Sequence, residues 1–318
     1  MLKRTLLFGS SAYLHLRYNQ LVITLPNGQG LERFTGGLDT IPVEDIGIVV
    51  LDDPQITISQ SLIAMLLEHN VALITCNGTH HPTGLLLPLD GNTLQSERFR
   101  VQIESSEPLR KQLWQQTVQA KILNQATLLN AVNPNIQSPM RLSYLAQTTK
   151  SGDPDNHEAQ AAVYYWANLF PPAMQFRRKP EGEAPNNLLN YGYAILRAIT
   201  ARALVCSGLL PTLGIHHHNK YNAYCLADDI MEPYRPFVDK IVCEMMNQYD
   251  DYQELTKEMK GDLLGIATTD VLLNEIRHPL MVAVSLTTAS LVKCFEGKQR
   301  KILYPTMTFS NLKNKDDE

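Results

Sequence analysis

The chain has 318 residues, of which 44% are hydrophobic and 19% charged, an ordinary composition for a globular protein of about two lobes. The formal net charge of −4 excludes a uniformly basic nucleic-acid binder. Because residues 1–96 carry four basic and eight acidic side chains and the remainder is balanced, we expect any polyanion to bind the second lobe. The apolar runs are too short to cross a membrane, the N-terminus lacks the pattern of a signal peptide, and the five scattered cysteines form no Cys-x-x-Cys pair. These features predict a reduced, cytoplasmic protein without structural zinc.

The first part of the chain, over residues 1–95, is predicted to be β-rich. Short apolar or alternating runs separated by turn residues predict strands over residues 2–8, 13–18, 20–25, 46–51 and 71–75. Leucines and an isoleucine at helical spacing predict one helix over 59–69, with Ser59 as its cap. Prolines and glycines from Pro82 to Gly91 end the pattern.

The second part, over residues 96–310, is predicted to be helical. The expected helices cover 108–131 behind Ser105 or Ser106, 139–148, Asp153 to about Phe170, 187–206, a segment beginning near Asp228, 263–277 and 279–295. A loop over 171–186 contains Arg177, Arg178 and Lys179, and a polar tail over 311–318 is expected to be disordered. The predicted fold class is therefore α+β, with an N-terminal β-rich domain followed by a larger all-α domain.

Candidate metal ligands gather in the stretch from Leu213 to Val238. Three histidines, His216 to His218, are followed by the acidic residues Asp228, Asp229 and Glu232. Histidine nitrogen with carboxylate oxygen is a ligand set for a divalent ion such as Mg²⁺ or Mn²⁺. Glu158 lies four residues before Ala162 on the expected inward edge of its helix, where a carboxylate needs a cation or a donor.

Each of these residues also has a structural explanation. A glutamate in a first helical turn can complement the helix dipole, a histidine can be hydrogen-bonded within a core, and acidic residues can cap a helix. Arg177, Arg178 and Lys179 could bind phosphates or lie in a solvated loop. No Walker loop, dinucleotide fingerprint, nucleophile elbow or zincin motif is present. Pattern and composition alone therefore indicate a two-lobe protein with a candidate metal site.

Four stretches resemble one known family in order along the chain. They are Gly36 to Pro42 with Ile46 to Leu51, His157-Glu-Ala-Gln-Ala-Ala162, Asn187-Leu-Leu-Asn-Tyr-Gly-Tyr-Ala-Ile-Leu196, and Gly214-Ile-His-His followed by Leu226-Ala-Asp-Asp-Ile-Met-Glu-Pro-Tyr-Arg-Pro-Phe-Val-Asp239. They resemble the CRISPR-associated adaptation integrase, the spacer-acquisition endonuclease of CRISPR immunity, most closely in its type II form.

The resemblance implies an N-terminal β-rich domain that mediates dimerisation and a helical C-terminal catalytic domain. It implies a homodimer, two copies of which would enclose a dimer of a small ferredoxin-like adaptation partner in a heterohexamer. The implied ligands of Mg²⁺ or Mn²⁺ are Glu158, His217 and Glu232. His217 is preferred to His216 because its interval to Glu232 matches related sequences. Asp229 and His216 are implied as neighbours of the ligands.

The implied reaction is transesterification on double-stranded DNA. The 3′-hydroxyl of a short foreign duplex, the protospacer, would attack a phosphodiester at the end of the CRISPR repeat, and water in its place would give endonuclease activity. Arg177, Arg178 and Lys179 are candidate contacts to the DNA backbone. Two alternatives stay open: a structure-selective DNA repair nuclease that needs no partner, and a non-catalytic DNA-binding scaffold.

Overall fold

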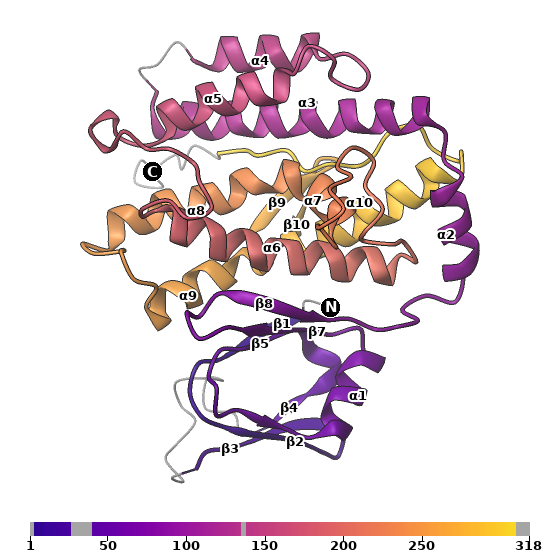
Figure 1. Cartoon of the computed structure of the whole chain (residues 1–318), viewed down its shortest axis with the longest axis vertical. Coiled ribbons are helices and arrows are strands. Elements are labelled where there is room, and N and C mark those ends of the chain that lie inside the picture. Colours follow the sequence, from indigo (N-terminus) through magenta and orange to yellow (C-terminus); the bar gives the residue numbers. More distant parts are fainter. Residues whose placement is uncertain (1–2, 27–39, 135–137, 310–318) are drawn as a thin grey trace, which may run out of the picture.

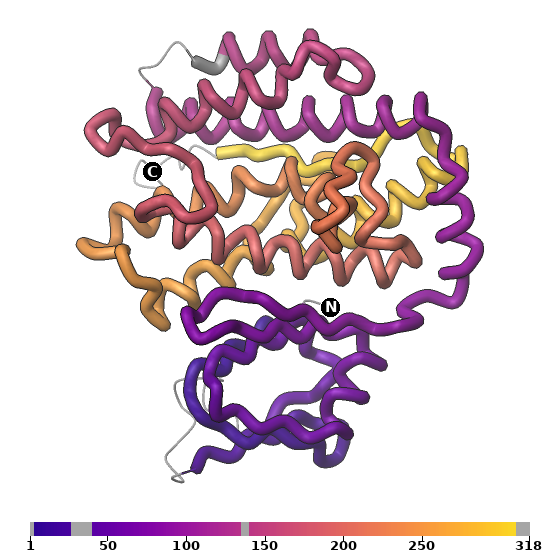
Figure 2. The backbone as a smooth tube through the Cα atoms, viewed as in Figure 1, coloured from indigo at the N-terminus to yellow at the C-terminus, as the bar shows by residue number. Residues whose placement is uncertain are grey.

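The computed structural model describes residues 3–26, 40–134 and 138–309 and shows a β-rich lobe next to a larger helical lobe (Figures 1 and 2). The predicted α+β fold class is confirmed. Within the described ranges, each helix is too short or too polar to span a bilayer. The tail over 311–318, which the sequence predicts to be disordered, lies outside the described residues.

Two four-stranded sheets and one helix form the first lobe. In sheet order, the first contains β1 (Arg4–Phe8), β5 (Ile46–Leu51), β7 (Ala72–Cys76) and β8 (Pro82–Leu86), and the second contains β4 (Thr40–Pro42), β3 (Gln20–Thr24), β2 (Tyr13–Arg17) and β6 (Thr57–Ile58). A single 3-10 turn, η1 (Val43–Asp45), precedes β5, and α1 (Gln60–Glu68) follows β6. The Ser59 hydroxyl accepts from the Leu62 amide and caps α1, as predicted.

The central strand β5 of the first sheet is buried on both faces because it lies between two cores. Alternate residues of β5 point to opposite sides, so Val49 joins the core of the first lobe while Ile48 and Val50 join the core of the helical lobe. This explains why the sequence of β5 is continuously apolar rather than alternating. Figure 1 shows α6 lying along the outer side of this sheet.

The second lobe contains nine α-helices in the described residues, together with short 3-10 turns and one hairpin. The α-helices are α2 (Gln95–Ile103), α3 (Glu107–Val132), α4 (Ser138–Thr148), α5 (His157–Leu169), α6 (Asn186–Cys206), α7 (Cys225–Met231), α8 (Arg235–Gln248), α9 (Lys257–Leu264) and α10 (Leu280–Phe295). The 3-10 turns are η2 (Pro172–Met174), η3 (Glu232–Tyr234) and η4 (Gly265–Thr268), and the hairpin pairs β9 (Asp270–Leu273) with β10 (Ile276–Pro279).

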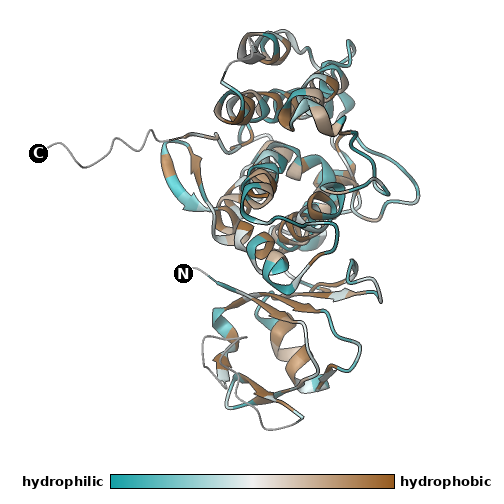
Figure 3. Ribbon diagram, turned by 90° about the vertical axis from the view of Figure 1, so that its left-hand side faces the viewer, coloured by the Kyte–Doolittle hydropathy of each residue, from teal (hydrophilic) through white to brown (hydrophobic). Residues whose placement is uncertain are grey.

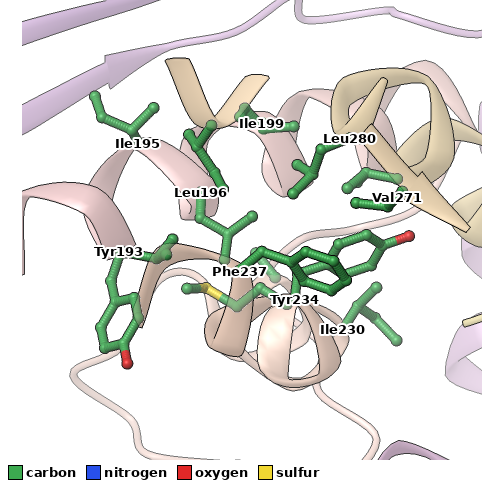
Figure 4. Packing of buried hydrophobic residues seen from close by; sticks show 14 of the residues in the cluster. Tyr193, Ile195, Leu196, Ile199, Ile230, Tyr234, Phe237, Val271 and Leu280 are labelled. Atoms are coloured by element: carbon green, nitrogen blue, oxygen red, sulfur yellow. The ribbon is translucent and has the colours of Figure 1, made fainter. Parts of the chain in front are cut away.

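Apolar residues of α6, α7, η3, α8, β9 and α10 meet in the centre of this lobe. Figure 4 shows Ile199, Tyr234, Phe237 and Leu280 packed together from four of these elements. The Tyr234 hydroxyl is satisfied inside the core by a 2.6 Å hydrogen bond with the Thr287 hydroxyl. In Figure 3 the hydrophobic colour is concentrated in the strands and central helices, whereas the connecting loops are mostly hydrophilic.

Three predictions about local structure are wrong. The helix expected over 263–277 is instead the end of α9, a 3-10 turn and the hairpin, because Asn274 and Glu275 both adopt positive φ and reverse the chain. The helix expected to begin at Asp153-Pro154 begins at His157. The pattern expected to end at Pro82 continues as β8, whose place at the sheet edge tolerates a proline.

Candidate metal centre

The loop that carries His216 to His218, called the histidine loop below, surrounds the Asp229 carboxylate. Asp229 is fully buried on α7, and its oxygens accept backbone N–H groups of Ile215 at 2.7 Å, His216 at 3.0 Å and His217 at 3.3 Å. Gly214 is required for this wrap, because a Cβ there would lie 2.3 Å from the His217 carbonyl oxygen and 2.8 Å from Asp229 Oδ2. Asp229 therefore fixes the backbone that carries the histidines.

The same carboxylate orients His217. Asp229 Oδ1 lies 2.5 Å from His217 Nδ1. This hydrogen bond raises the pKa of His217, against the opposing effect of burial, and the nearby Glu232 and Glu158 carboxylates raise it further. With Nδ1 bound to a carboxylate, Nε2 is the nitrogen that remains for a metal, an arrangement common among metal-binding histidines.

His216 has a different environment. Its ring stacks on Trp114 of α3, with the ring centroids 4.1 Å apart and the planes 1° from parallel. Burial, with a contribution from His217, lowers the pKa of His216. The stacking holds His216 against α3 and leaves His217, edge-on to the same Trp114 at 5.6 Å, as the better candidate ligand.

Glu158 is positioned by a cap in the loop before α5. Asp153 Oδ1 accepts the His157 amide at 2.8 Å, and Asp153 Oδ2 accepts the Glu158 amide at 2.9 Å. The predicted N-cap position is therefore wrong, since Asn156 precedes the first helical residue, but the Asp153 side chain still satisfies amides of the first turn. Because the cap binds the backbone of Glu158 itself, it fixes where this side chain leaves the helix.

Glu232 lies in η3, between α7 and α8. Pro233 and Pro236 interrupt the helical hydrogen bonding that would otherwise join the two helices. The carboxylate is buried, with Oε1 2.9 Å from Arg235 Nε and Oε2 2.6 Å from Lys121 Nζ. Burial would raise the pKa of Glu232, but Arg235 and Lys121 outweigh it and lower the pKa.

Lys121 of α3 connects the two candidate glutamate ligands. Its Nζ lies 2.7 Å from Glu158 Oε1 as well as 2.6 Å from Glu232 Oε2, so the two carboxylates converge on one cation. Lys121 is not among the site residues predicted from the sequence. Its signal was a lysine among the apolar positions of a long helix, between Val118 and Ile122.

The donor set fits a divalent cation. Carboxylate oxygens from two elements meet a positive charge, and an oriented histidine lies beside them. Glu232 Oε2 forms its ion pair without hydrogen-bond geometry, which leaves a buried oxygen suited to a metal bond. In the described parts of the chain no three His, Cys, Asp or Glu side chains are grouped so that they could hold a metal ion, and oxygens of the two glutamates contact Lys121 instead.

Two other predicted groups lie outside this convergence. Asp228 forms a two-pronged ion pair with Arg197, at 2.6 and 3.1 Å. In the loop after α5, Arg178 donates to Asn186 at 2.9 Å and Asn190 at 2.7 Å, so its guanidinium is used within the protein. Its neighbours Arg177 and Lys179 have exposed side chains.

Comparison with known proteins gives consistent matches over most of the chain. The family model described as CRISPR associated protein Cas1 matches residues 5–276. A CRISPR-associated endonuclease Cas1 from Neisseria meningitidis is 35% identical over 300 residues, 94% of each chain. One from Pyrobaculum aerophilum is 28% identical over 79% of this chain and 88% of its own.

Solved structures share the fold. A casposase bound to integration product superposes with a TM-score of 0.77 at 18% identity, covering 94% of this chain and 92% of the casposase. A Cas1 protein from Thermotoga maritima gives a TM-score of 0.69 at 16% identity, covering 93% of this chain and 98% of its own. A Cas6-RT-Cas1–Cas2 complex chain gives 0.72 at 20% identity over 94% of this chain, which corresponds to 35% of that longer chain.

Proposed function

Because the chain belongs to the Cas1 family of CRISPR-associated proteins, we propose that it is a metal-dependent DNA endonuclease and integrase that inserts short foreign DNA into a CRISPR array. The observation that carries this proposal is the convergence of Glu158 and Glu232 on one cationic position beside His217. Curated relatives named as endonucleases and a fold neighbour solved with its integration product support it.

The reaction we propose is transesterification. The 3′-hydroxyl oxygen of the incoming duplex forms a bond to a phosphorus atom of the repeat, and the bond from that phosphorus to its original 3′-oxygen breaks. One phosphodiester replaces another, so no energy-rich cofactor is consumed. Water as the attacking group gives hydrolysis at the same position, which accounts for an endonuclease and an integrase in one site.

Residues of this chain position the candidate metal ligands in the absence of DNA. Glu158, His217 Nε2 and Glu232 would hold Mg²⁺ or Mn²⁺. Such an ion supplies charge stabilisation at the phosphoryl group and at the leaving oxygen. Asp229 keeps the His217 ring in one tautomer and orientation, and Arg235 holds Oε1 of Glu232, the oxygen that does not contact Lys121. The centre is thereby pre-organised by protein groups that hold the candidate ligands in place.

We also propose the assembly in which the site works. Arg177 and Lys179 are exposed near the start of α6 and suit sequence-independent contacts to DNA phosphates, whereas Arg178 supports the loop that carries them. Two homodimers, each formed through the β-rich lobe, would enclose a dimer of a small ferredoxin-like partner in a heterohexamer, which would place a site at each of the two ends of one protospacer. Fold neighbours solved as Cas1–Cas2 complexes and as a Cas1–DNA complex support this arrangement.

The test is a strand-transfer assay. The protein, with its small partner, is incubated with a short duplex, a supercoiled plasmid that carries a repeat, and Mg²⁺ or Mn²⁺. We expect covalent joining of duplex to plasmid, and we expect Glu158→Gln, His217→Ala and Glu232→Gln each to abolish it with circular dichroism unchanged. Metal-dependent cutting without joining would indicate the repair nuclease instead. DNA binding without either reaction would indicate a scaffold.

His216→Ala is the matched control for His217→Ala. Both changes remove one imidazole from the same loop, but His216 is stacked on Trp114 and His217 is oriented by Asp229. We expect His216→Ala to retain most of the strand-transfer rate and His217→Ala to lose it. The reverse result would assign the ligand role to His216.

A further inference from the structure

One cation already occupies the point at which the two candidate ligands converge. Lys121 comes from α3, whereas Glu158 belongs to α5 and Glu232 to η3, so the contact joins three separate elements. The Lys121 side chain is only 10% exposed, and that of Glu232 is 6% exposed. A lysine and a glutamate are seldom buried to this degree unless each has a charged partner.

Without this lysine the two carboxylates would repel each other in a region with little water. Arg235 compensates Glu232 through the other oxygen, Oε1. For Glu158, Lys121 is the only ion-pair partner among the residues that the structure describes. Lys121 and Arg235 together therefore balance the two glutamates before any metal is present.

A divalent metal and the ammonium group require the same oxygens. An ion held by Glu158 Oε1 and Glu232 Oε2 would take the two oxygens that now contact the Lys121 ammonium group, and the two neighbouring positive charges would repel each other strongly. We propose that Lys121 is a resident cation of the metal centre, which holds Glu158 and Glu232 together in the metal-free protein and is displaced when the metal binds. This inference rests on the metal-dependent function proposed above.

The helix that carries Lys121 offers a place for the displaced ammonium group. Gln125 lies four residues later, hence on the same face of α3, and is 3% exposed. Its Oε1 atom is buried without a hydrogen-bond partner in the described structure. The lysine stem has four rotatable bonds and can move its ammonium group from the carboxylates to a nearby acceptor while the helix stays fixed.

The test is metal binding and stability in Lys121→Met, which keeps the length and apolar character of the stem. Mn²⁺ is titrated into the metal-free full chain by calorimetry, and thermal unfolding is followed in EDTA and in saturating Mn²⁺. We expect Mn²⁺ to bind the variant at least about tenfold more tightly than the wild type, because no ammonium group must be expelled. We expect a lower melting temperature in EDTA and a larger rise on adding Mn²⁺.

Lys111→Met is the matched control. Lys111 lies on the same helix and pairs with Glu107 at 2.7 Å, but both side chains are exposed. The control removes one positive charge without touching the centre, so its Mn²⁺ affinity should equal that of the wild type. Lys121→Gln, a neutral side chain that can still donate to a glutamate, should behave like Lys121→Met.

Several outcomes would overturn the inference. Unchanged or weaker Mn²⁺ binding in both Lys121 variants, or a failure of both to fold even in Mn²⁺, would make Lys121 purely structural. In another outcome, Mn²⁺ binding is lost in Glu232→Gln and yet is no tighter in the Lys121 variants than in the wild type. That result would keep the proposed function and reject the displacement. Absence of Mn²⁺ binding in the wild type and in every variant would reject both.

Discussion

Asp229 has no exposed surface, and its carboxylate accepts hydrogen bonds from Ile215, His216 and His217 of the histidine loop. It combines two tasks that are usually separate, since it accepts backbone N–H groups and also orients an imidazole. Asparagine has the same shape but carries an NH₂ group in place of one oxygen. One of the loop contacts would then become a clash between donors, at a cost of about 1–3 kcal/mol for the unsatisfied groups.

We predict that Asp229→Asn destabilises the protein more in acid than in alkali. The hydrogen bond from Asp229 raises the pKa of His217, so the folded chain keeps a proton that the unfolded chain releases near its ordinary pKa of about 6.5. The pair therefore stabilises the fold fully below about pH 6.5, and this contribution disappears as the pH rises through the folded pKa. Urea denaturation of both proteins at about pH 5.5 and pH 8.5 measures this. A loss of stability that is equal at both values would contradict the assignment.

At this scale the sequence selects candidate residues but does not predict their contacts. His217, Asp229, Glu158 and Glu232 can be selected from residue types and from the family resemblance, because ligand chemistry is a property of the side chain. Lys121 was not selected, because its role depends on α3 lying beside both α5 and η3. No local pattern encodes that proximity.

Among the helices, α5 shows how one cap can position a site. Asp153 binds the amides of both His157 and Glu158. We predict that Asp153→Ala lowers the free energy of unfolding by about 1 kcal/mol and also reduces strand transfer, because Glu158 loses its fixed starting point. Ser106→Ala is the control, since Ser106 caps α3 at Leu109, in the first turn of that helix. A control that loses as much activity as Asp153→Ala would show a general effect of helix fraying.

The sequence predicts elements well where one periodicity is strong. The ranges of α1, α3, α6, α10 and β5 agree with the structure because caps and apolar stripes define them. α2 was not predicted, since it is a short and largely polar helix. The hairpin after α9 was mistaken for a helix because Val271, Leu272 and Leu273 fit either period, and only the turn at Asn274 distinguishes them.

The two lobes are joined by a buried ion pair. Asp52, which follows β5, lies 2.6 Å from Lys260 of α9, and their side chains are 3% and 6% exposed. We predict that Lys260→Met lowers the free energy of unfolding by about 3–5 kcal/mol, because it leaves a buried carboxylate whose one remaining ion-pair partner among the described residues is His80. Adding Asp52→Leu should recover part of the loss. Lys150→Met, which breaks an exposed pair with Asp155, should cost less than about 1 kcal/mol.

DNA binding by the whole molecule should depend on the loop between α5 and α6. We predict that Arg177→Ala with Lys179→Ala weakens DNA binding and lowers the slope of log affinity against log salt by about 2, since each side chain neutralises one phosphate. Arg4→Ala with Arg17→Ala, two exposed positions on the β-rich lobe, is the charge-matched control and should leave the slope unchanged. An unchanged slope in the double variant would place the DNA elsewhere on the protein.

The most direct test of the central claim is anomalous diffraction from crystals grown with Mn²⁺. We predict one strong peak about 2 Å from oxygens of Glu158 and Glu232 and from Nε2 of His217, with the Lys121 ammonium group moved away from both carboxylates. Asp229 should remain bound to Nδ1 of His217. A peak at another position, or no peak while Lys121 still bridges the two glutamates, would contradict the account.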